Sequence, residues 1–183
     1  MILKTLALVL LVAVASVLLV AARRPDHFTV QRSLLIHAGA EKIHPLIADL
    51  HRFNTWNPYD QKDPAMQRRY EGPASGPGAA YAFKGNSQVG EGRIELLSVE
   101  PPHHVAMRLQ MIAPMAADNR VDFTLVPQAD GTGTLVTWAM AGQQPFLGRL
   151  VGVFIDIDRM VGGDFDAGLA SLKALAERSA AGA

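Results

Sequence analysis

The chain has 183 residues, of which 49% are hydrophobic and 19% charged, so it is long and apolar enough for one domain with a substantial core. Seventeen basic and seventeen acidic side chains cancel, and we therefore expect no nucleic-acid partner. The absence of cysteine excludes disulfides, thiol nucleophiles and thiolate metal sites.

The N-terminus carries an apolar segment. Residues 5–22 contain no charged side chain, and as a helix they would be about 27 Å long, close to the thickness of a bilayer's hydrocarbon core. We predict a single-pass membrane anchor over residues 1–24, followed by a domain over residues 25–183. A cleaved signal peptide is the alternative, because Lys4 supplies a short positive region and Ala22 ends a tolerable cleavage site. Lys4 and Arg23-Arg24 nearly balance the positive charge across the segment, so the side occupied by the domain stays open.

After the anchor, short elements precede a longer run of strands. Alternating apolar residues predict a strand over 28–36, and one apolar face predicts a helix over 41–50. A second helical turn over 52–56 is expected to stop at Pro58. Prolines and glycines then predict a loop over 60–78 around one short strand, 67–71.

From residue 79 the pattern is that of an antiparallel meander with one apolar face. Gly90 and Gly92 inside a strand indicate a bulge or sharp curvature. The predicted strands are 79–84, 89–99, 104–111, 117–127 and 133–142.

The final segment predicts one long amphipathic helix over 146–178, with apolar residues at steps of three or four. Gly162-Gly163 indicates either a bend or the close approach of a neighbouring backbone. Asp156, Asp158, Asp164 and Asp166 are expected on a solvated face. The predicted fold class is α+β: a curved antiparallel sheet of about six or seven strands around a long C-terminal helix, plus the N-terminal helix.

Several segments resemble one superfamily. They are the strand 28–36, Trp56-Asn57-Pro58-Tyr59, Asp63-Pro64, residues 81–92, Pro101-Pro102, residues 133–138, and Val161 to Phe165 followed by Gly168-Leu169. Together they look like the START-like (SRPBCC) superfamily of polyketide cyclase/dehydrase and lipid transport type. The resemblance implies the helix-grip fold of Bet v 1 and a cavity for lipids, sterols or polyketides. The matching motifs are structural, so no cyclase activity is transferred from them.

Catalytic and metal-binding candidates are few. The six histidines, His27, His37, His44, His51, His103 and His104, form no recognised metal motif, and we expect surface or capping roles for them and no metal or cofactor. No Gly-x-Ser-x-Gly elbow is present. Asp60, Arg93 and Asp122 are possible polar contacts at a pocket mouth, although exposed positions are the expected ones. The catalytic residues are left open.

Aromatic and methionine side chains are the candidate ligand contacts. Any one of them could simply pack in the core, but Tyr and Trp need partners for their polar atoms, and methionines give a deformable wall. The predicted ligand-binding residues are Trp56, Tyr59, Tyr81, Phe83, Met107, Met111, Phe123, Trp138, Met140 and Phe154.

Three functions fit this sequence. The preferred one is a membrane-tethered protein that binds a small hydrophobic ligand between sheet and helix. The second is an enzyme of the cyclase or aromatase type that uses the same cavity, with Asp60, Arg93 and Tyr81 steering proton transfer. The third is an interaction domain whose cavity is filled. Ligand identity, catalysis and oligomeric state stay open.

Overall fold

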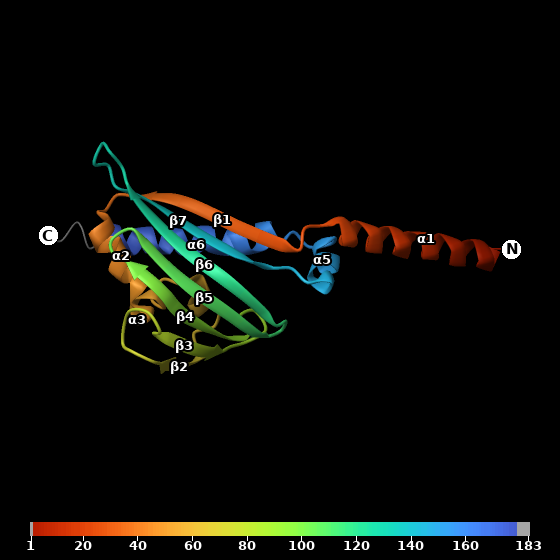
Figure 1. Ribbon diagram of the computed structural model, residues 1–183, viewed down its shortest axis with the longest axis horizontal. Coiled ribbons are helices and arrows are strands. Elements are labelled where there is room, and N and C mark those ends of the chain that lie inside the picture. Colours follow the sequence, from red (N-terminus) through yellow and green to blue (C-terminus); the bar gives the residue numbers. More distant parts are fainter. Residues whose placement is uncertain (1, 179–183) are drawn as a thin grey trace.

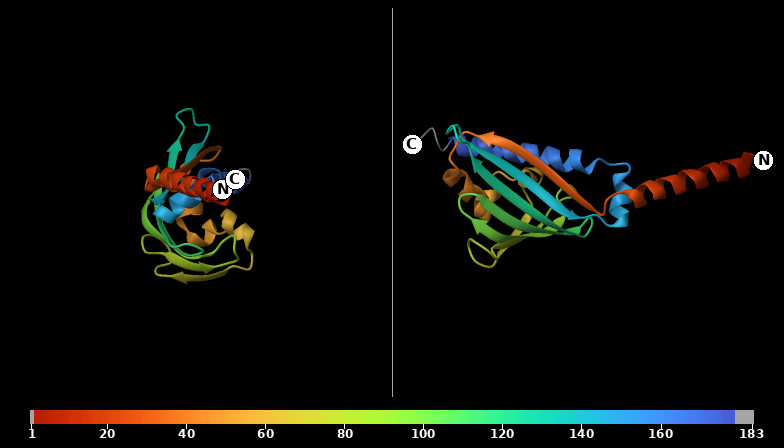
Figure 2. Two further views of the ribbon diagram at one scale, coloured as in Figure 1. Left: turned by 90° about the vertical axis from the view of Figure 1, so that its right-hand side faces the viewer. Right: turned by 45° about the horizontal axis from the view of Figure 1, so that its top comes forward.

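The computed structural model describes residues 2–178. A seven-stranded antiparallel sheet curves around one long helix, and an N-terminal helix extends away from the domain (Figures 1 and 2). The strand order is β1-β7-β6-β5-β4-β3-β2. The strands are β1 (His27–Ile36), β2 (Gln67–Glu71), β3 (Ala80–Lys84), β4 (Glu91–Glu100), β5 (His104–Ala113), β6 (Ala117–Pro127) and β7 (Thr134–Gln143). The helices are α1 (Ile2–Arg23), α2 (Ala40–Ala48), α3 (Leu50–Phe53), α4 (Pro58–Lys62), α5 (Phe146–Gly152) and α6 (Ile157–Arg178).

The predicted fold class is confirmed. Alternate residues of each central strand point to the concave face, as Val121, Phe123 and Leu125 do on β6, and α6 packs against that face beside β1. The apolar face of the helix therefore meets the apolar face of the sheet, with α2, α3 and α4 covering the rest.

The curvature predicted at Gly90 and Gly92 is present as a register shift between Glu91 and Gly92. A Cβ atom on Gly92 would lie 2.5 Å from the carbonyl oxygen of Gln110 and 2.8 Å from the ring of Phe83. Glycine at this position lets neighbouring strands approach where the sheet bends.

The C-terminal segment is two helices, so the prediction of one continuous helix was wrong. Helix α5 ends at Gly152, and the side chain of Asp156 accepts a hydrogen bond from the backbone N–H of Arg159 at 3.0 Å. A carboxylate in this position caps the start of a new helix. The apolar periodicity continues through the break and hides it.

At the glycine pair in α6 the group that comes close is a side chain and not a neighbouring backbone. The guanidinium of Arg32 lies over Gly162, where a Cβ atom would be 1.9 Å from its Nη2 atom. Arg32 donates to the carboxylate of Asp158 at 2.9 Å and lies 3.4 Å from that of Asp166. Both carboxylates are nevertheless exposed, as expected of a solvated acidic face, and Asp164 is the one that departs from it, because it is mostly buried against Lys62.

Pro58 begins a helix, where the sequence pattern predicted the end of one and a loop. The side chain of Asn57 accepts the backbone N–H of Tyr59 at 3.3 Å, and proline suits the first turn because its missing N–H needs no partner. Helix α4 packs against α6 and, as shown below, carries the polar groups of the interior.

Candidate functional site in the interior of the grip

Burial along β5 differs between the two ends of the concave face. The anchor end is the edge where β1 begins and β7 ends, next to α1, and it includes the β3–β4 and β5–β6 turns. The far end is the opposite edge, covered by α2 and α3. On β5, Val105 and Met107 toward the far end are 0% and 1% exposed, whereas Leu109 and Met111 toward the anchor end are half-buried.

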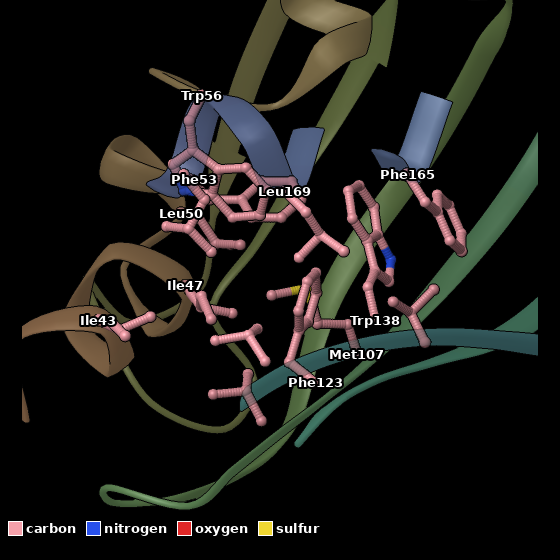
Figure 3. Close-up of a cluster of buried hydrophobic side chains, with 14 of the residues drawn as sticks. Ile43, Ile47, Leu50, Phe53, Trp56, Met107, Phe123, Trp138, Phe165 and Leu169 are labelled. Atoms are coloured by element: carbon pink, nitrogen blue, oxygen red, sulfur yellow. The ribbon is translucent and has the colours of Figure 1, made fainter. Parts of the chain in front are cut away.

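The far end is filled by aromatic side chains (Figure 3). The rings of Trp138 and Phe165 stack with centroids 4.1 Å apart, and Trp56 meets Trp138 edge-on at 5.8 Å. Phe123 lies 5.0 Å from Trp138. These contacts seal the interior on the side of α2 and α3 and leave no ligand space among these four rings.

The anchor end is partly open. Apolar side chains of the sheet and of α6 pack against the core there while remaining partly exposed. We call this set the mouth, and it consists of Phe28, Ile94, Leu109, Met111 and Val161. An apolar wall that is sealed at one end and half-exposed at the other is the geometry through which a hydrophobic molecule could enter.

Two buried polar atoms on the concave face have no hydrogen-bond partner within residues 2–178. They are the indole Nε1 of Trp138, a donor, and the side-chain Oδ1 of Asn119, an acceptor. Buried polar atoms are nearly always paired, so each is a point where a polar group of a ligand would be stabilised. They lie on neighbouring strands, with Asn119 toward the anchor end.

A polar cluster forms the wall on the side of α4, β2 and β3. The carboxylate of Asp60 accepts a hydrogen bond from Arg68 and is 8% exposed. Burial raises the pKa of Asp60 above its ordinary value, against the lowering effects of Arg68 and Asn57. The second oxygen of Asp60 and the Nε of Arg68 have no partner in the described part of the chain.

Two tyrosines belong to the same wall. Burial raises the pKa of Tyr81, and the negative charge of Asp60 adds to the shift. Burial likewise raises the pKa of Tyr59, with the charge of Asp164 as the next cause. Asp164 of α6 is also bound by Lys62 at 2.6 Å, which ties α4 to α6. Both phenols therefore stay neutral and can act only as uncharged donors or acceptors.

The predicted ligand-binding residues fall into three groups. Seven of them are buried in the core, two are half-buried beside it, and one lies outside it. Phe154, in the connection between α5 and α6, is 75% exposed and far from the interior packing. The buried ones are Trp56, Tyr81, Phe83, Met107, Phe123, Trp138 and Met140, and the half-buried ones are Tyr59 and Met111.

Of the proposed catalytic trio, the structure brings two residues together. Asp60 and Tyr81 share the interior wall, so the expectation that Asp60 is an exposed charge was wrong. Arg93 points to the opposite face of the sheet, where it binds Glu71 at 3.1 Å and Glu95 at 2.5 Å.

Asp122 also lies away from the interior. Its carboxylate binds His104 at 2.9 Å and Arg120 at 2.8 Å. His44 departs from the expected surface or capping role, because it is 5% exposed, its Nε2 has no partner among residues 2–178, and burial lowers its pKa. Within these residues no three His, Asp or Glu side chains are arranged to hold a metal ion.

Sequence reasoning missed Arg68 and Asn119. Asn119 is in phase with Val121 and Phe123, so the alternation of β6 already placed it on the concave face. Arg68 shares its side of β2 with Tyr70, but nothing local to that strand indicates its pairing with Asp60.

Two surface hollows are also present, and neither lies between the sheet and α6. One, of about 520 Å³, is a wide depression over the convex face and the anchor-end edge, and its lining includes Arg108 and Arg120 together with Phe28 of the mouth and Asn119. The other, of about 390 Å³, lies between the start of α2 and the β6–β7 turn. The candidate site is instead the mouth with the interior behind it, defined by partly exposed apolar side chains and by the buried polar atoms without a partner among residues 2–178.

Comparison with known families gives one match. Residues 27–177 match the family described as polyketide cyclase / dehydrase and lipid transport. No curated protein matches this sequence.

Solved structures share the fold. The di-domain aromatase/cyclase StfQ of the steffimycin biosynthetic pathway aligns with a TM-score of 0.65 and 13% identity, over 87% of this chain and 54% of StfQ. Major latex-like protein 151 from Panax ginseng aligns with a TM-score of 0.56 and 10% identity, over 82% of this chain and 97% of that protein. The Aha1 protein from Colwellia psychrerythraea aligns with a TM-score of 0.54 and 16% identity, over 80% of this chain and 93% of that protein.

Proposed function

The chain belongs to the polyketide cyclase/dehydrase and lipid transport family, and from this premise we propose that it binds a small hydrophobic ligand while tethered to a membrane. The ligand, a lipid, a sterol or a polyketide-like molecule, would occupy the interior between the concave face and α6. Helix α1 would be the tether.

The observation that carries this proposal is the unequal burial along β5. A domain stabilised only by its core gains from burying the whole apolar face, because each Å² removed from water contributes ~25 cal/mol. The mouth residues Leu109 and Met111 instead remain partly exposed, whereas Val105 and Met107 of the same strand are fully buried. A ligand that covers Leu109 and Met111 would remove from water the apolar surface that the protein's own side chains leave uncovered.

The unpartnered atoms favour a ligand with at least one polar group. The indole N–H of Trp138 can donate to a carbonyl or hydroxyl oxygen, and the Oδ1 of Asn119 can accept from a hydroxyl. A molecule with an apolar body and a few oxygens therefore suits this interior better than a plain hydrocarbon.

The tether rests on α1. Its 22 residues have a mean hydropathy of 2.8 over the most apolar window, and only 6% of that window is buried inside the protein. A helix so apolar and so exposed needs an apolar solvent. The same features would suit a signal sequence, and the experiment that separates the two follows in the Discussion.

Ligand entry can be tested with the protein's own fluorescence. Trp56 and Trp138 are the two tryptophans of the chain, and both lie in the interior. With the full chain in phosphatidylcholine nanodiscs, a dibrominated stearate should quench their emission on binding. The replacement Met111→Gln, which makes the mouth more polar, should weaken the quenching titration about tenfold, since part of a methionine's ~1.5–3 kcal/mol of burial is lost.

The matched control is Ile112→Gln. Ile112 follows Met111 on the same strand, is 63% exposed and points to the convex face. Its replacement should leave quenching unchanged. If brominated stearate and brominated sterol both leave the tryptophan emission untouched, the interior is closed to ligands and the protein is better described as an interaction domain.

The polar cluster around Asp60 and Tyr81 supports a second candidate function, that of a cyclase or aromatase that uses the same interior. The buried Asp60, with a raised pKa beside the phenol of Tyr81, is a suitable group for moving a proton. The test is turnover of a poly-β-ketone thioester. Equal rates for the native chain, Asp60→Asn and Tyr81→Phe would remove this assignment.

A further inference from the structure

The anchor end carries an exposed apolar surface that the mouth and the core do not use. Five large apolar side chains of α5, the following connection and the start of α6 are between 43% and 75% exposed. We call them the rim: Phe146, Leu147, Phe154, Ile155 and Met160. Five exposed large apolar side chains within a stretch of fifteen residues indicate a site that contacts another protein or a membrane.

Helix α5 is fastened to the last turn of α1. The guanidinium of Arg149 donates to the carbonyl oxygens of Ala22 and Arg24 at 3.5 and 3.3 Å, and Ala21 is fully buried. Gly152 faces Arg24, where a Cβ atom would lie 3.1 Å from the guanidinium. Figure 2 shows α5 beside the inner end of α1.

This attachment fixes the height of the rim relative to a bilayer. The uncharged run of α1 ends at Ala22, and the first charges after it are Arg23 and Arg24. In a spanning helix that boundary lies where the hydrocarbon gives way to headgroups. Since α5 contacts the chain at this boundary, Phe146 and Leu147 lie at the depth of the membrane interface.

The charges around the rim suit anionic lipid. Within residues 23–26 and 146–160 there are four arginines, Arg23, Arg24, Arg149 and Arg159, and three carboxylates, Asp26, Asp156 and Asp158, of which Asp158 is bound by Arg32 at 2.9 Å. Asp26 is paired with His27 at 3.2 Å, and Asp156 caps α6. Arginine beside exposed aromatic and aliphatic side chains is the composition of segments that lie in the interface of anionic membranes.

We propose that the rim inserts into the surface of an anionic phospholipid bilayer, the same bilayer that α1 spans. The domain then rests on the membrane with its anchor end down. The mouth lies at that end, so a hydrophobic ligand would pass between bilayer and interior without crossing water. This inference rests on the tether of the proposed function and adds the surface through which exchange occurs.

Single labels can test the docking, because the chain has no cysteine. A nitrobenzoxadiazole label on Leu147→Cys or Phe154→Cys is measured in nanodiscs of phosphatidylcholine and phosphatidylglycerol that contain a lipid with a nitroxide high on its acyl chain. Both labels should be quenched about twofold or more, as expected for side chains at the interface. Omitting phosphatidylglycerol should reduce the quenching, and equal quenching without it would overturn the role of the arginines.

The matched control is Val126→Cys. Val126 is an apolar side chain of similar exposure, 49%, near the far end of β6. Its label should stay unquenched. If all three labels behave alike, the rim does not lie on the bilayer and the proposal fails.

This result is separable from ligand binding. Unquenched rim labels combined with tryptophan quenching by brominated stearate would leave the ligand site standing and remove the docking. Quenched rim labels combined with tryptophan emission that brominated stearate does not change would support the docking and remove the ligand site. Phe154→Glu should slow the uptake of brominated stearate from the nanodisc and leave its final extent unchanged, and an unchanged rate would overturn the exchange route.

Discussion

Asp60 and Arg68 form the most heavily buried ion pair of the interior. A buried pair contributes little net stability, but removing one partner leaves an uncompensated charge and is costly. The Oδ2 atom of Asp60 and the Nε atom of Arg68 have no partner among residues 2–178, and the charges of both residues act on Tyr81, which favours a role for the pair beside that phenol.

Replacing Arg68 by leucine should expose this dependence on charge. Arg68→Leu should lower the free energy of unfolding by about 3 kcal/mol near neutral pH. Without the guanidinium, burial raises the pKa of Asp60 further above its ordinary value of 3.8. The folded state then binds a proton more tightly than the unfolded state does, so the variant should recover stability as the pH falls through that raised pKa.

The measurement is the difference in unfolding free energy between variant and native chain over the acid range, which removes the common effect of surface carboxylates. Arg69→Leu is the control, because Arg69 is its exposed neighbour on β2. The double variant Arg68→Leu with Asp60→Asn should lose the pH dependence. A deficit that stays constant with pH would contradict the assignment.

At the scale of elements, the contact between α6 and β1 depends on Gly162. A methyl group there would displace the guanidinium of Arg32 from Asp158 and Asp166, whereas a Cβ on the adjacent Gly163 would meet no atom of residues 2–178 within 4 Å. Two neighbouring glycines of one helix thus have different roles.

Alanine scanning of this pair should separate them. Gly163→Ala should stabilise the protein by about 0.5–1 kcal/mol through helix propensity alone. Gly162→Ala should be less stable than Gly163→Ala by about 1 kcal/mol or more, a difference of ~2–4 °C in melting temperature. Thermal denaturation followed by circular dichroism would measure it, and equal melting temperatures would show that Arg32 adjusts without cost.

The elements themselves were largely predictable from sequence. The alternation of apolar and polar residues located the strands, because each strand has one buried and one exposed face. The apolar residues at steps of three or four located α6. The break before α6 was missed because the apolar spacing continues across Asp156, whose capping role depends on backbone conformation.

The site was less predictable, because burial depends on what covers a strand. Met107 and Met111 have the same place in the pattern of β5, yet one is sealed under α2 and the aromatic cluster and the other opens at the mouth. The partner of Asp60 is likewise set by how α4 meets β2, which periodicity within either element does not report.

At the scale of the whole molecule, α1 decides where the protein works. If it is an anchor, the full chain of 19.7 kDa should stay in the membrane pellet after alkaline carbonate extraction from a bacterial host. Replacing Leu11 and Val14 by arginine should abolish this retention, since each charge costs about 2.5–3.5 kcal/mol at the centre of a spanning helix. A shorter, extractable product from the native chain would instead show signal cleavage.

The junction between α1 and the sheet is very short. Three residues, Arg24 to Asp26, separate the end of α1 from the start of β1, and they can reach at most about 11 Å when fully extended. If α1 is an anchor, so short a connection would keep the domain at its own membrane and would not let it carry a ligand to another one. A domain anchored in this way would diffuse laterally in one membrane and exchange ligand with a single leaflet. It could pass the ligand on only to a second protein that binds to it.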